Sequence, residues 1–432
     1  MSSRLTSKPG RRTSSAEQAA GGPGAIPPRI QRYEDFAYGL FLHWGLYSLR
    51  GVGEWTMAHH RVPRNAYARL ARRFTAEDWD PAALVHWAKS AGFRYICLTT
   101  RHHDGFSLYD TCGLNRFDAL HAAAGRDLVA PFAQACQAAG LGLFFYHTTL
   151  DWRHPAFDRD WDGYQRYLRD SVELLCTRYG RVDGFWFDGN WSRPDRDWQE
   201  DALYGLIRRH QPEAIILNNS GIHARGAARH PEIDAVTFEQ GAAAAGVSAT
   251  DRYRAREVCE TFNHHWGLAT GDLAHKGPAA VIERLAACRA GGANLLMNVG
   301  PLASGALPAY EQAALEVVGR WIRDHAGHML YTGRPAGVSA EGRDFVLGSG
   351  RDYAYFAHDL PTATNEHLGG RSGERMIRGT LPRIRRISWA DTDEVLPHTQ
   401  ARDRSSVTFQ ATPHAYGAQA VVRVARLEVT GA

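Results

Sequence analysis

The stretch Val182-Asp183-Gly184-Phe185-Trp186-Phe187-Asp188-Gly189 indicates the fold of this chain. Its near-continuous apolar run is typical of a strand buried on both faces, as in a parallel sheet. The run ends in one carboxylate, Asp188, and Gly189 then allows the chain to turn and a ligand to approach the backbone closely. Asp183 stands before the strand, where a capping or pairing role is expected.

Seven more runs of the same kind occur along the chain, and helical patterns lie between most of them. Two connections, 219–234 and 240–256, look irregular instead. Eight strands with mostly helical crossovers predict an α/β fold, a (β/α)₈-type barrel. The other expected strands are Phe36–His43, Tyr95–Thr100, Leu141–His147, Ala214–Asn218, Ala235–Glu239, Glu257–Phe262 and Asn294–Val299, and the expected helices are Pro81–Ala91, Leu128–Ala139, Asp162–Tyr179, Trp198–His210, Pro278–Ala290 and Pro308–His325.

The two ends of the chain differ from this pattern. Residues 1–29 are rich in Ser, Gly, Ala, Arg and Pro and are expected to form a disordered tail, so that the barrel would span 30–333. Residues 334–432 predict a small antiparallel β-sandwich, because short apolar runs alternate there with turn signals. The expected strands of this domain are Asp344–Leu347, Tyr353–Ala357, Arg385–Trp389, Ser406–Gln410 and Ala420–Val429.

Composition excludes several classes of function. A net charge of +4 on 432 residues gives no reason to expect nucleic acid or an anionic membrane as partner. No apolar segment is long enough to span a bilayer, and the N-terminus lacks the apolar run of a secretory signal, so a cytoplasmic location is expected. The six cysteines form no C-x-x-C pair, which disfavours a zinc knuckle. The oligomeric state stays open.

Polar or aromatic side chains follow nearly every expected strand. In a parallel barrel the carboxyl ends of the strands surround one pocket, where active sites lie. The chain also has twelve Trp, many of them beside His, Asp or Glu, and Trp can stack on the apolar faces of sugar rings. The clusters are His43-Trp44-Gly45, His102-His103-Asp104, Tyr146-His147, Asp188-Gly189, Asn218-Asn219, Glu239-Gln240 and Asn298.

From residue 34 to 333 the sequence resembles the α-L-fucosidases of glycoside hydrolase family 29. Each motif alone is weak, whereas their order and their spacing along the expected strands make the resemblance specific. The motifs are Phe41-Leu42-His43-Trp44-Gly45, Gly53-Glu54-Trp55, Leu98-Thr99-Thr100-Arg101-His102-His103-Asp104-Gly105-Phe106, Asp151-Trp152, Trp186-Phe187-Asp188-Gly189, Glu260-Thr261-Phe262-Asn263 with Trp266-Gly267, and Asn294-Leu295-Leu296-Met297-Asn298-Val299-Gly300-Pro301.

The resemblance implies a retaining exo-glycosidase that removes terminal fucose from an oligosaccharide or glycoconjugate without a cofactor. Asp188 would be the nucleophile, and a glutamate would act as acid/base about 5–5.5 Å away. Neutral histidines and a carboxylate suit the sugar hydroxyls, and an aromatic wall suits the C6 methyl group. The residues expected to line the fucose pocket are His43, Glu54, Trp55, His102, His103, Tyr146 and Trp186.

The acid/base has three candidates, because its sequence context varies within the family. Glu239 is favoured, since it ends the expected sixth strand and similar Phe-Glu segments occur there in some bacterial members. Glu260 ends the next apolar run, and Glu232 is the third choice. Whichever residue acts, its pKa should be raised so that it can donate a proton near neutral pH.

Three alternatives remain at this stage. The pairs His59-His60, His102-His103 and His264-His265 could suggest a metal site, but adjacent residues of a strand face opposite sides, so no metal is expected. The substrate could be a related sugar such as an α-L-galactoside, or the protein could bind sugar without catalysis.

The stretch Asn218-Asn219-Ser220 departs from the family, whose members often carry an Arg there.

Overall fold

The computed structural model describes residues 26–242, 252–365 and 373–430. Most of the predicted tail, residues 1–25, lies outside the described residues. Pro28 and Arg29 already belong to helix α1 (Pro28–Phe36), so the tail prediction extends too far at its C-terminal end. Proline in the first turn suits a helix start, because its missing N–H has no intrahelical partner there.

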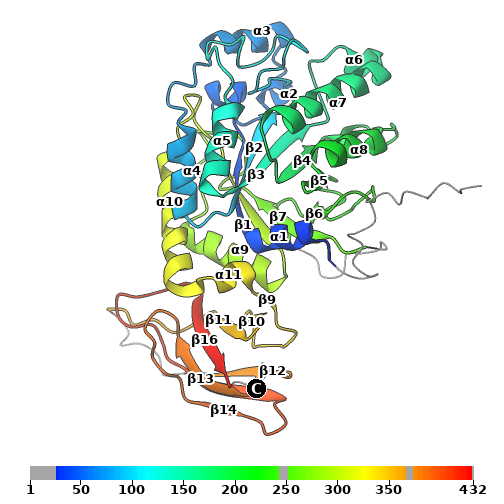
Figure 1. Cartoon of the computed structure of the whole chain (residues 1–432). Coiled ribbons are helices and arrows are strands. Elements are labelled where there is room, and N and C mark those ends of the chain that lie inside the picture. Colours follow the sequence, from blue (N-terminus) through cyan, green and yellow to red (C-terminus); the bar gives the residue numbers. More distant parts are fainter. Residues whose placement is uncertain (1–25, 243–251, 366–372, 431–432) are drawn as a thin grey trace, which may run out of the picture.

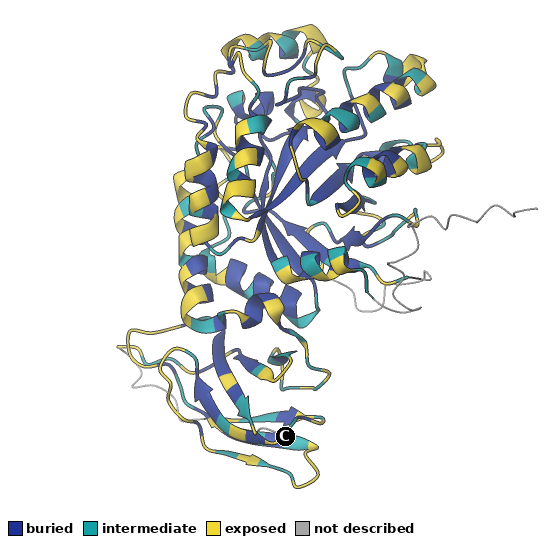
Figure 2. Cartoon of the chain, in the orientation of Figure 1, coloured by how far each residue is buried: buried dark blue, intermediate teal, exposed yellow. Residues whose placement is uncertain are grey.

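The predicted α/β barrel is confirmed. Eight parallel strands follow one another in chain order, and β8 pairs with β1 to close the barrel (Figure 1). All eight strands are almost wholly buried, whereas the helices expose their outer faces (Figure 2). The strands are β1 (Tyr38–Leu42), β2 (Tyr95–Arg101), β3 (Gly142–Thr148), β4 (Gly184–Asp188), β5 (Ile215–Asn219), β6 (Ala235–Thr237), β7 (Ala255–Glu260) and β8 (Asn294–Val299).

Every barrel strand except β8 differs from its predicted bounds by one or two residues. Phe36 is the last residue of helix α1, although it was predicted to begin β1. The sequence pattern did not separate the two elements, because the apolar run continues across the turn between them. Strand β6 stops at Thr237, so Glu239 lies two residues beyond the strand instead of ending it. Strand β7 begins at Ala255 and ends at Glu260, two residues earlier than expected.

Helices cover the barrel in the predicted order. Asp80 caps α4 by accepting a hydrogen bond from the Ala83 N–H, and Asp160 caps α7 in the same way. The two connections that were predicted to be irregular contain no helix in their described residues. These residues are 220–234, 238–242 and 252–254, and 243–251 lie outside the described residues. The main crossover helices are α4 (Pro81–Ser90), α5 (Val129–Ala139), α7 (Trp161–Arg178), α8 (Glu200–His210), α9 (Pro278–Ala290) and α10 (Ala309–Trp321), and the short helices are α2 (Thr56–His59), α3 (Arg64–Ala68), α6 (Ala156–Arg159) and α11 (Met329–Thr332).

The C-terminal domain consists of two antiparallel sheets, as predicted, that share one core. The ring of Tyr355 in one sheet meets that of Phe409 in the other at 5.0 Å. Three strands were missed, including β12, whose pattern Gly-Glu-Arg-Met-Ile-Arg buries only Ile377. The sheets comprise β9 (Arg334–Pro335), β10 (Phe345–Ser349), β11 (Asp352–Ala357), β13 (Ile384–Trp389) and β16 (Arg423–Val429), and β12 (Gly373–Arg378), β14 (His398–Gln400) and β15 (Ser406–Ala411).

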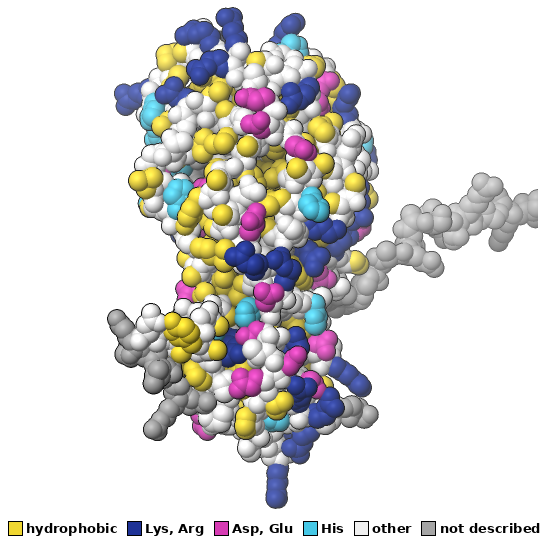
Figure 3. Space-filling view, turned by 90° about the vertical axis from the view of Figure 1, so that its left-hand side faces the viewer, with side chains coloured by type: hydrophobic (Ala, Val, Ile, Leu, Met, Phe, Trp, Pro, Cys, Tyr) yellow, Lys and Arg dark blue, Asp and Glu magenta, His cyan; other side chains and the backbone are white. Residues whose placement is uncertain are grey.

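This domain packs against the α10–α11 side of the barrel (Figure 1). The Trp321 indole of α10 donates a hydrogen bond to the Val422 carbonyl over 2.7 Å. The face drawn in Figure 3 carries both acidic and basic side chains, and several Lys and Arg side chains lie side by side across its middle. Among the described helices, none is long and apolar enough to cross a membrane.

Candidate active site

The alternation of side chains along β4 decides where Asp188 points. Phe185 and Phe187 pack outward in the core between the barrel and its helices, whereas Trp186 packs inside the barrel. Because side chains of a strand alternate between its two faces, Asp188 shares the inward direction of Trp186. It is also the last residue of β4, so its carboxylate lies at the carboxyl end of the barrel.

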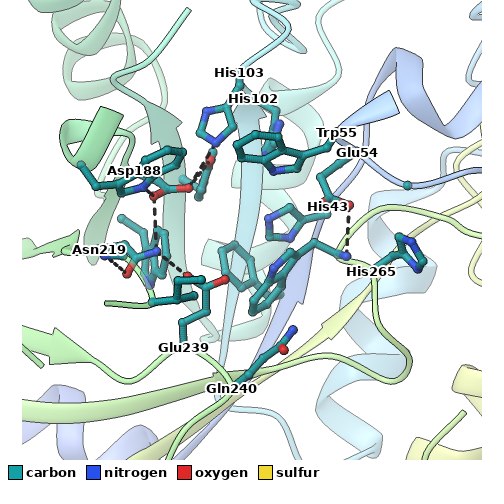
Figure 4. A pocket seen from close by; sticks show the side chains of 18 of the residues that line it. His43, Glu54, Trp55, His102, His103, Asp188, Asn219, Glu239, Gln240 and His265 are labelled. Carbon is teal, nitrogen blue, oxygen red and sulfur yellow. Dashed lines mark hydrogen bonds and ion pairs between the residues drawn. The ribbon is translucent and has the colours of Figure 1, made fainter. Parts of the chain in front are cut away.

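A cavity of about 850 Å³ opens at this end. All nine predicted site residues line it, although they come from five different strands or the loops after them (Figure 4). None of the described residues of the C-terminal domain takes part in the lining. The nine are His43, Glu54, Trp55, His102, His103, Tyr146, Trp186, Asp188 and Glu239.

Asp188 is held by hydrogen-bond donors on both carboxylate oxygens. Oδ1 accepts from the Trp191 indole at 2.7 Å and from the Asn219 amide at 3.3 Å. Oδ2 accepts from the Tyr146 hydroxyl at 3.1 Å and lies 3.4 Å from Nε2 of His103. Burial raises the pKa of Asp188, but these donors outweigh burial and hold the pKa below its ordinary value. The carboxylate is therefore ionised and fixed in direction.

Glu239 lies across the cavity floor from Asp188, and Asn219 connects the two (Figure 4). The Asn219 amide nitrogen is 3.3 Å from Oδ1 of Asp188 and 2.9 Å from Oε2 of Glu239, so these two oxygens are at most 6.2 Å apart, the sum of the two distances. Burial and the negative charge of Asp188 raise the pKa of Glu239, against the hydrogen bond from Asn219. The pair therefore combines an ionised carboxylate with a carboxyl group that keeps its proton to higher pH.

His43 is neutral and its tautomer follows from its neighbours. The Asn298 amide donates through Nδ2 to the Trp266 carbonyl at 2.7 Å, so its oxygen faces Nδ1 of His43, also at 2.7 Å. Nδ1 therefore carries the hydrogen, which leaves Nε2 as an acceptor. Burial lowers the pKa of His43 to about 3. A neutral ring of this kind can accept a hydrogen bond from a sugar hydroxyl.

His102 and His103 both face the cavity, which corrects the prediction that such a pair must face opposite sides. Strand β2 ends at Arg101, so both histidines lie on the turn that follows, and their ring centres are 4.2 Å apart. Nδ1 of His103 is bound to the Thr148 hydroxyl at 2.7 Å, and burial lowers the pKa of His102 well below its ordinary value. Within the described ranges, no three His, Cys, Asp or Glu side chains are grouped as metal ligands.

Glu54 and Trp55 come from the long connection after β1. Oε2 of Glu54 accepts from the backbone N–H groups of Gly267 at 2.8 Å and Trp266 at 3.1 Å, which ties this connection to the one after β7. Burial raises the pKa of Glu54. The Trp55 ring lies nearly parallel to that of Trp191, with centres 6.0 Å apart. The two indoles form an aromatic wall beside Asp188.

Trp186 offers the cavity its ring face rather than its N–H group. Its indole nitrogen donates to Oε1 of Glu257 at 2.9 Å inside the barrel, and its ring stacks on Tyr146 at 5.4 Å. Glu257 also accepts from the hydroxyls of Tyr95 and of Tyr33, which belongs to α1. A buried carboxylate with three donors thus fixes the floor of the cavity from below.

The other two acid/base candidates do not line the cavity. On β7 the residues packed inside the barrel include Ala255 and Cys259, so Glu260 faces the opposite way, toward α9. There it pairs with Arg284 at 2.9 Å. Glu232 pairs with Arg208 at 2.8 Å. Alternation along β7 thus accounts for the outward direction of Glu260, whereas Glu239 lies beyond the end of β6.

Several cavity residues were not predicted. Trp191 stands three residues after Asp188, and Asn219 ends β5, where its amide reaches both carboxylates. The run Asn218-Asn219 was noted at a strand end, yet nothing in it indicates which amide faces the barrel axis. Arg229, from the connection between β5 and β6, also lines the cavity.

Comparisons with known proteins identify the family of this chain. A family model described as α-L-fucosidase matches residues 26–327. The tissue α-L-fucosidase of Bos taurus is 24% identical over 351 residues, which cover 72% of this chain and 70% of that protein. An α-L-fucosidase of Branchiostoma floridae is 25% identical over 338 residues, 70% of this chain and 72% of that protein.

Solved structures share the whole architecture. The α-L-fucosidase isoenzyme 1 from Paenibacillus thiaminolyticus has a TM-score of 0.79 and 29% identity, and the match covers 94% of this chain and 99% of that one. A family 29 α-L-fucosidase from Bacteroides thetaiotaomicron, trapped as a covalent intermediate with 2-fluoro-fucosyl fluoride, has a TM-score of 0.80 at 19% identity, over 96% of this chain and 98% of that one.

Proposed function

Because the chain belongs to the α-L-fucosidase family of glycoside hydrolases, we propose that it is a retaining exo-glycosidase that removes terminal α-L-fucose from oligosaccharides or glycoconjugates by double displacement. The observation that carries this proposal is the pair of carboxyl groups at the cavity floor. Asn219 bridges one oxygen of each group, and these two oxygens are at most 6.2 Å apart, which is compatible with the roughly 5–5.5 Å between the carboxyl groups of retaining enzymes.

In the first step Asp188 attacks the anomeric carbon of the bound fucoside. Its carboxylate is ionised, and its donors leave it pointing into the cavity. Glu239 donates its proton to the glycosidic oxygen as the bond to the leaving group breaks. The raised pKa of Glu239 keeps this proton available, as general-acid catalysis requires.

In the second step water displaces the enzyme from the sugar. Once Asp188 is esterified, its negative charge no longer raises the pKa of Glu239. Glu239 then loses its proton more readily and can accept one from the attacking water. The protons balance over the two steps, since Glu239 gives a proton in the first step and regains one in the second.

The remaining cavity residues suit a deoxyhexose. His43 presents a neutral acceptor nitrogen, Glu54 a carboxylate, and Trp186 and Trp55 supply apolar ring faces. Each is fixed by a partner away from the cavity, which limits the entropy lost on binding. The covalent fucosyl intermediate trapped in the Bacteroides thetaiotaomicron relative supports a double displacement in this family.

Hydrolysis of 4-nitrophenyl α-L-fucoside by the wild type and by Asp188→Ala tests the proposal. We expect turnover by the wild type and its loss in the variant, with an unchanged melting temperature. The configuration of the first product, followed by NMR, should be retained. Full activity of Asp188→Ala, or an inverted first product, would refute the mechanism. 4-Nitrophenyl α-L-galactoside, measured in parallel, tests the related-sugar alternative.

A further inference from the structure

Among its described lining residues, the cavity carries one permanent cation, the exposed Arg229. Among the described residues that line the cavity, the only Lys or Arg is Arg229, and the only carboxylates are Glu54, Asp188 and Glu239. Those three are buried or half-buried, whereas Arg229 is exposed, and each of the three already accepts a hydrogen bond. The outer wall therefore presents positive charge without an acidic neighbour in the lining.

Arg229 differs from the arginines around it in having no partner among the residues that the structure describes. Arg208 pairs with Glu232 and Asp234, and Arg225 donates to the Glu239 carbonyl at 2.5 Å. For Arg229, by contrast, no hydrogen bond or ion pair joins its guanidinium to any described residue. Its five donors remain available to a ligand, in the planar fork that binds carboxylate or sulfate through two parallel hydrogen bonds.

Arg229 lies close to the side chains that hold the nucleophile. It also lines a second, small cavity of about 20 Å³ together with Trp191 and Asn219, both of which donate to Asp188. Glu200 shares this small cavity, but no ion pair within 4.0 Å joins it to Arg229. Because Trp191 and Asn219 both contact Asp188, Arg229 lies near the reaction centre.

The cavity has room for more than the fucose ring. Its volume of about 850 Å³ is near the upper end of the usual 300–1,000 Å³ range for ligand pockets. Two exposed apolar residues, Ile222 and Val52, also line it, at 51% and 42% exposure. A leaving group seated there would meet these apolar side chains and one unpaired cation.

We propose that Arg229 binds an oxyanion on the leaving group, so that the preferred substrates are α-L-fucosides attached to a carboxylated or sulfated aglycone. This inference rests on the proposed function and adds a substrate class to it. An Arg–oxyanion contact at a partly exposed site gives selectivity rather than great affinity, and it weakens as salt screens the charge.

The test compares 4-carboxyphenyl α-L-fucoside with its methyl ester, and includes 4-sulfophenyl α-L-fucoside as a third substrate. For each enzyme the ratio of kcat/KM between charged and uncharged substrate is measured. The charged and uncharged leaving groups differ in intrinsic reactivity, and this difference is the same for the wild type and for Arg229→Gln. Dividing the wild-type ratio of kcat/KM values by the ratio for Arg229→Gln therefore removes it. We expect this quotient to be roughly five- to tenfold, the size of a charge-assisted hydrogen bond near the surface.

Arg209→Gln is the matched control, since Arg209 is exposed on α8 and does not line the cavity. When the wild-type ratio is divided by the ratio for Arg209→Gln, the quotient should be close to one. The quotient for Arg229→Gln should decrease as salt is added. A preference for both charged substrates indicates general oxyanion binding, and a preference for the carboxylate alone indicates an acidic sugar. If both enzymes hydrolyse charged and neutral substrates with the same ratio, the inference is wrong while the fucosidase function stands. If the wild type hydrolyses none of the three, the proposed function itself fails.

Discussion

The indole nitrogen of Trp191 donates a hydrogen bond to Oδ1 of Asp188 over 2.7 Å. Trp191 lies on the turn Asn190–Ser192, only three residues after the nucleophile, so a short local segment supplies one of its donors. A hydrogen bond to a charged acceptor contributes about 1.5–3 kcal/mol, which is roughly one to two powers of ten in an equilibrium. Together with His103, which lowers the pKa of Asp188 most, this contact keeps Asp188 ionised inside the cavity.

Trp191→Phe should lower kcat/KM by about tenfold or more and move the acidic limb of its pH profile to higher pH. Phenylalanine keeps an aromatic face toward Trp55 but cannot donate, so the pKa of Asp188 rises. The pH dependence of kcat/KM measures both effects. Trp87→Phe is the control, because it removes an indole–carboxylate bond to Glu316 on the surface. If the acidic limb of the pH profile of Trp191→Phe stayed at the wild-type pH, the indole would not be an important donor to Asp188.

Glu200 should act as a positioning residue behind the reaction centre. Its Oε1 accepts from the amides of Asn190 at 3.0 Å and Asn218 at 3.2 Å, and these residues directly precede Trp191 and Asn219. Glu200→Ala should reduce kcat by roughly tenfold and shift the acidic limb upward, because both donors to Asp188 lose support. Glu200→Gln should recover most of the activity, since an amide oxygen can accept the same bonds.

The neighbouring variant Asp201→Ala is the control for Glu200, because Asp201 is fully exposed on the same turn of α8. Melting temperatures separate a positioning effect from unfolding. If Glu200→Ala kept the wild-type kcat and pH profile, the two asparagines would be holding the donors without Glu200.

The basic limb of the pH profile should belong to Glu239. Activity requires Asp188 ionised and Glu239 protonated, so it falls as pH drops through the pKa of Asp188, which is lowered, and as pH rises through that of Glu239, which is raised. Glu239→Gln cannot ionise and should abolish the basic limb. It should also lower kcat/KM by about 10²–10⁴-fold for sugar leaving groups and much less for 2,4-dinitrophenolate, which needs no proton.

Glu260→Gln provides the matched comparison, because Glu260 lies on the adjacent strand end yet pairs with Arg284 outside the cavity. Its basic limb should remain in place. A basic limb that disappeared in Glu260→Gln but persisted in Glu239→Gln would reverse the assignment of the acid/base.

The buried carboxylate of Glu257 should make stability depend on pH. Burial raises its pKa in the folded state, so its favourable contribution is greatest below its unfolded pKa, about 4.3, and is lost as pH rises through the folded pKa. Glu257→Gln lacks this titration, so its melting temperature relative to wild type should improve with rising pH. Exposed Glu316→Gln on α10 should show no such trend, and an equal trend in both variants would contradict the explanation.

Glu257→Ala should be far more damaging than Glu257→Gln. It leaves Tyr95, Tyr33 and the Trp186 indole without an acceptor inside the barrel, at about 1–3 kcal/mol for each unpaired buried group. Thermal unfolding measures the loss. A melting temperature equal to that of the wild type would mean that the three donors find other partners.

The sequence by itself determined the barrel and the ring of residues around its mouth. Apolar runs such as Val182–Asp188 predict buried parallel strands, because hydrophobic burial depends on local pattern, and the carboxyl ends of such strands must converge. The side-chain alternation of a strand is equally local. On β7 it puts Glu260 on the opposite face from Cys259, but it does not orient Glu239, which lies two residues beyond the end of β6.

Only the tertiary structure decided how these residues act on one another. The Asn219 amide reaches both carboxylates, and Glu257 reaches Tyr33, 224 residues away in the chain, because strand stagger and loop paths bring their atoms within hydrogen-bonding distance. The pKa values of Asp188 and Glu239 move apart for the same reason. Electrostatic energies change over a few ångströms, and such distances between separate segments are not encoded in the pattern of any one of them.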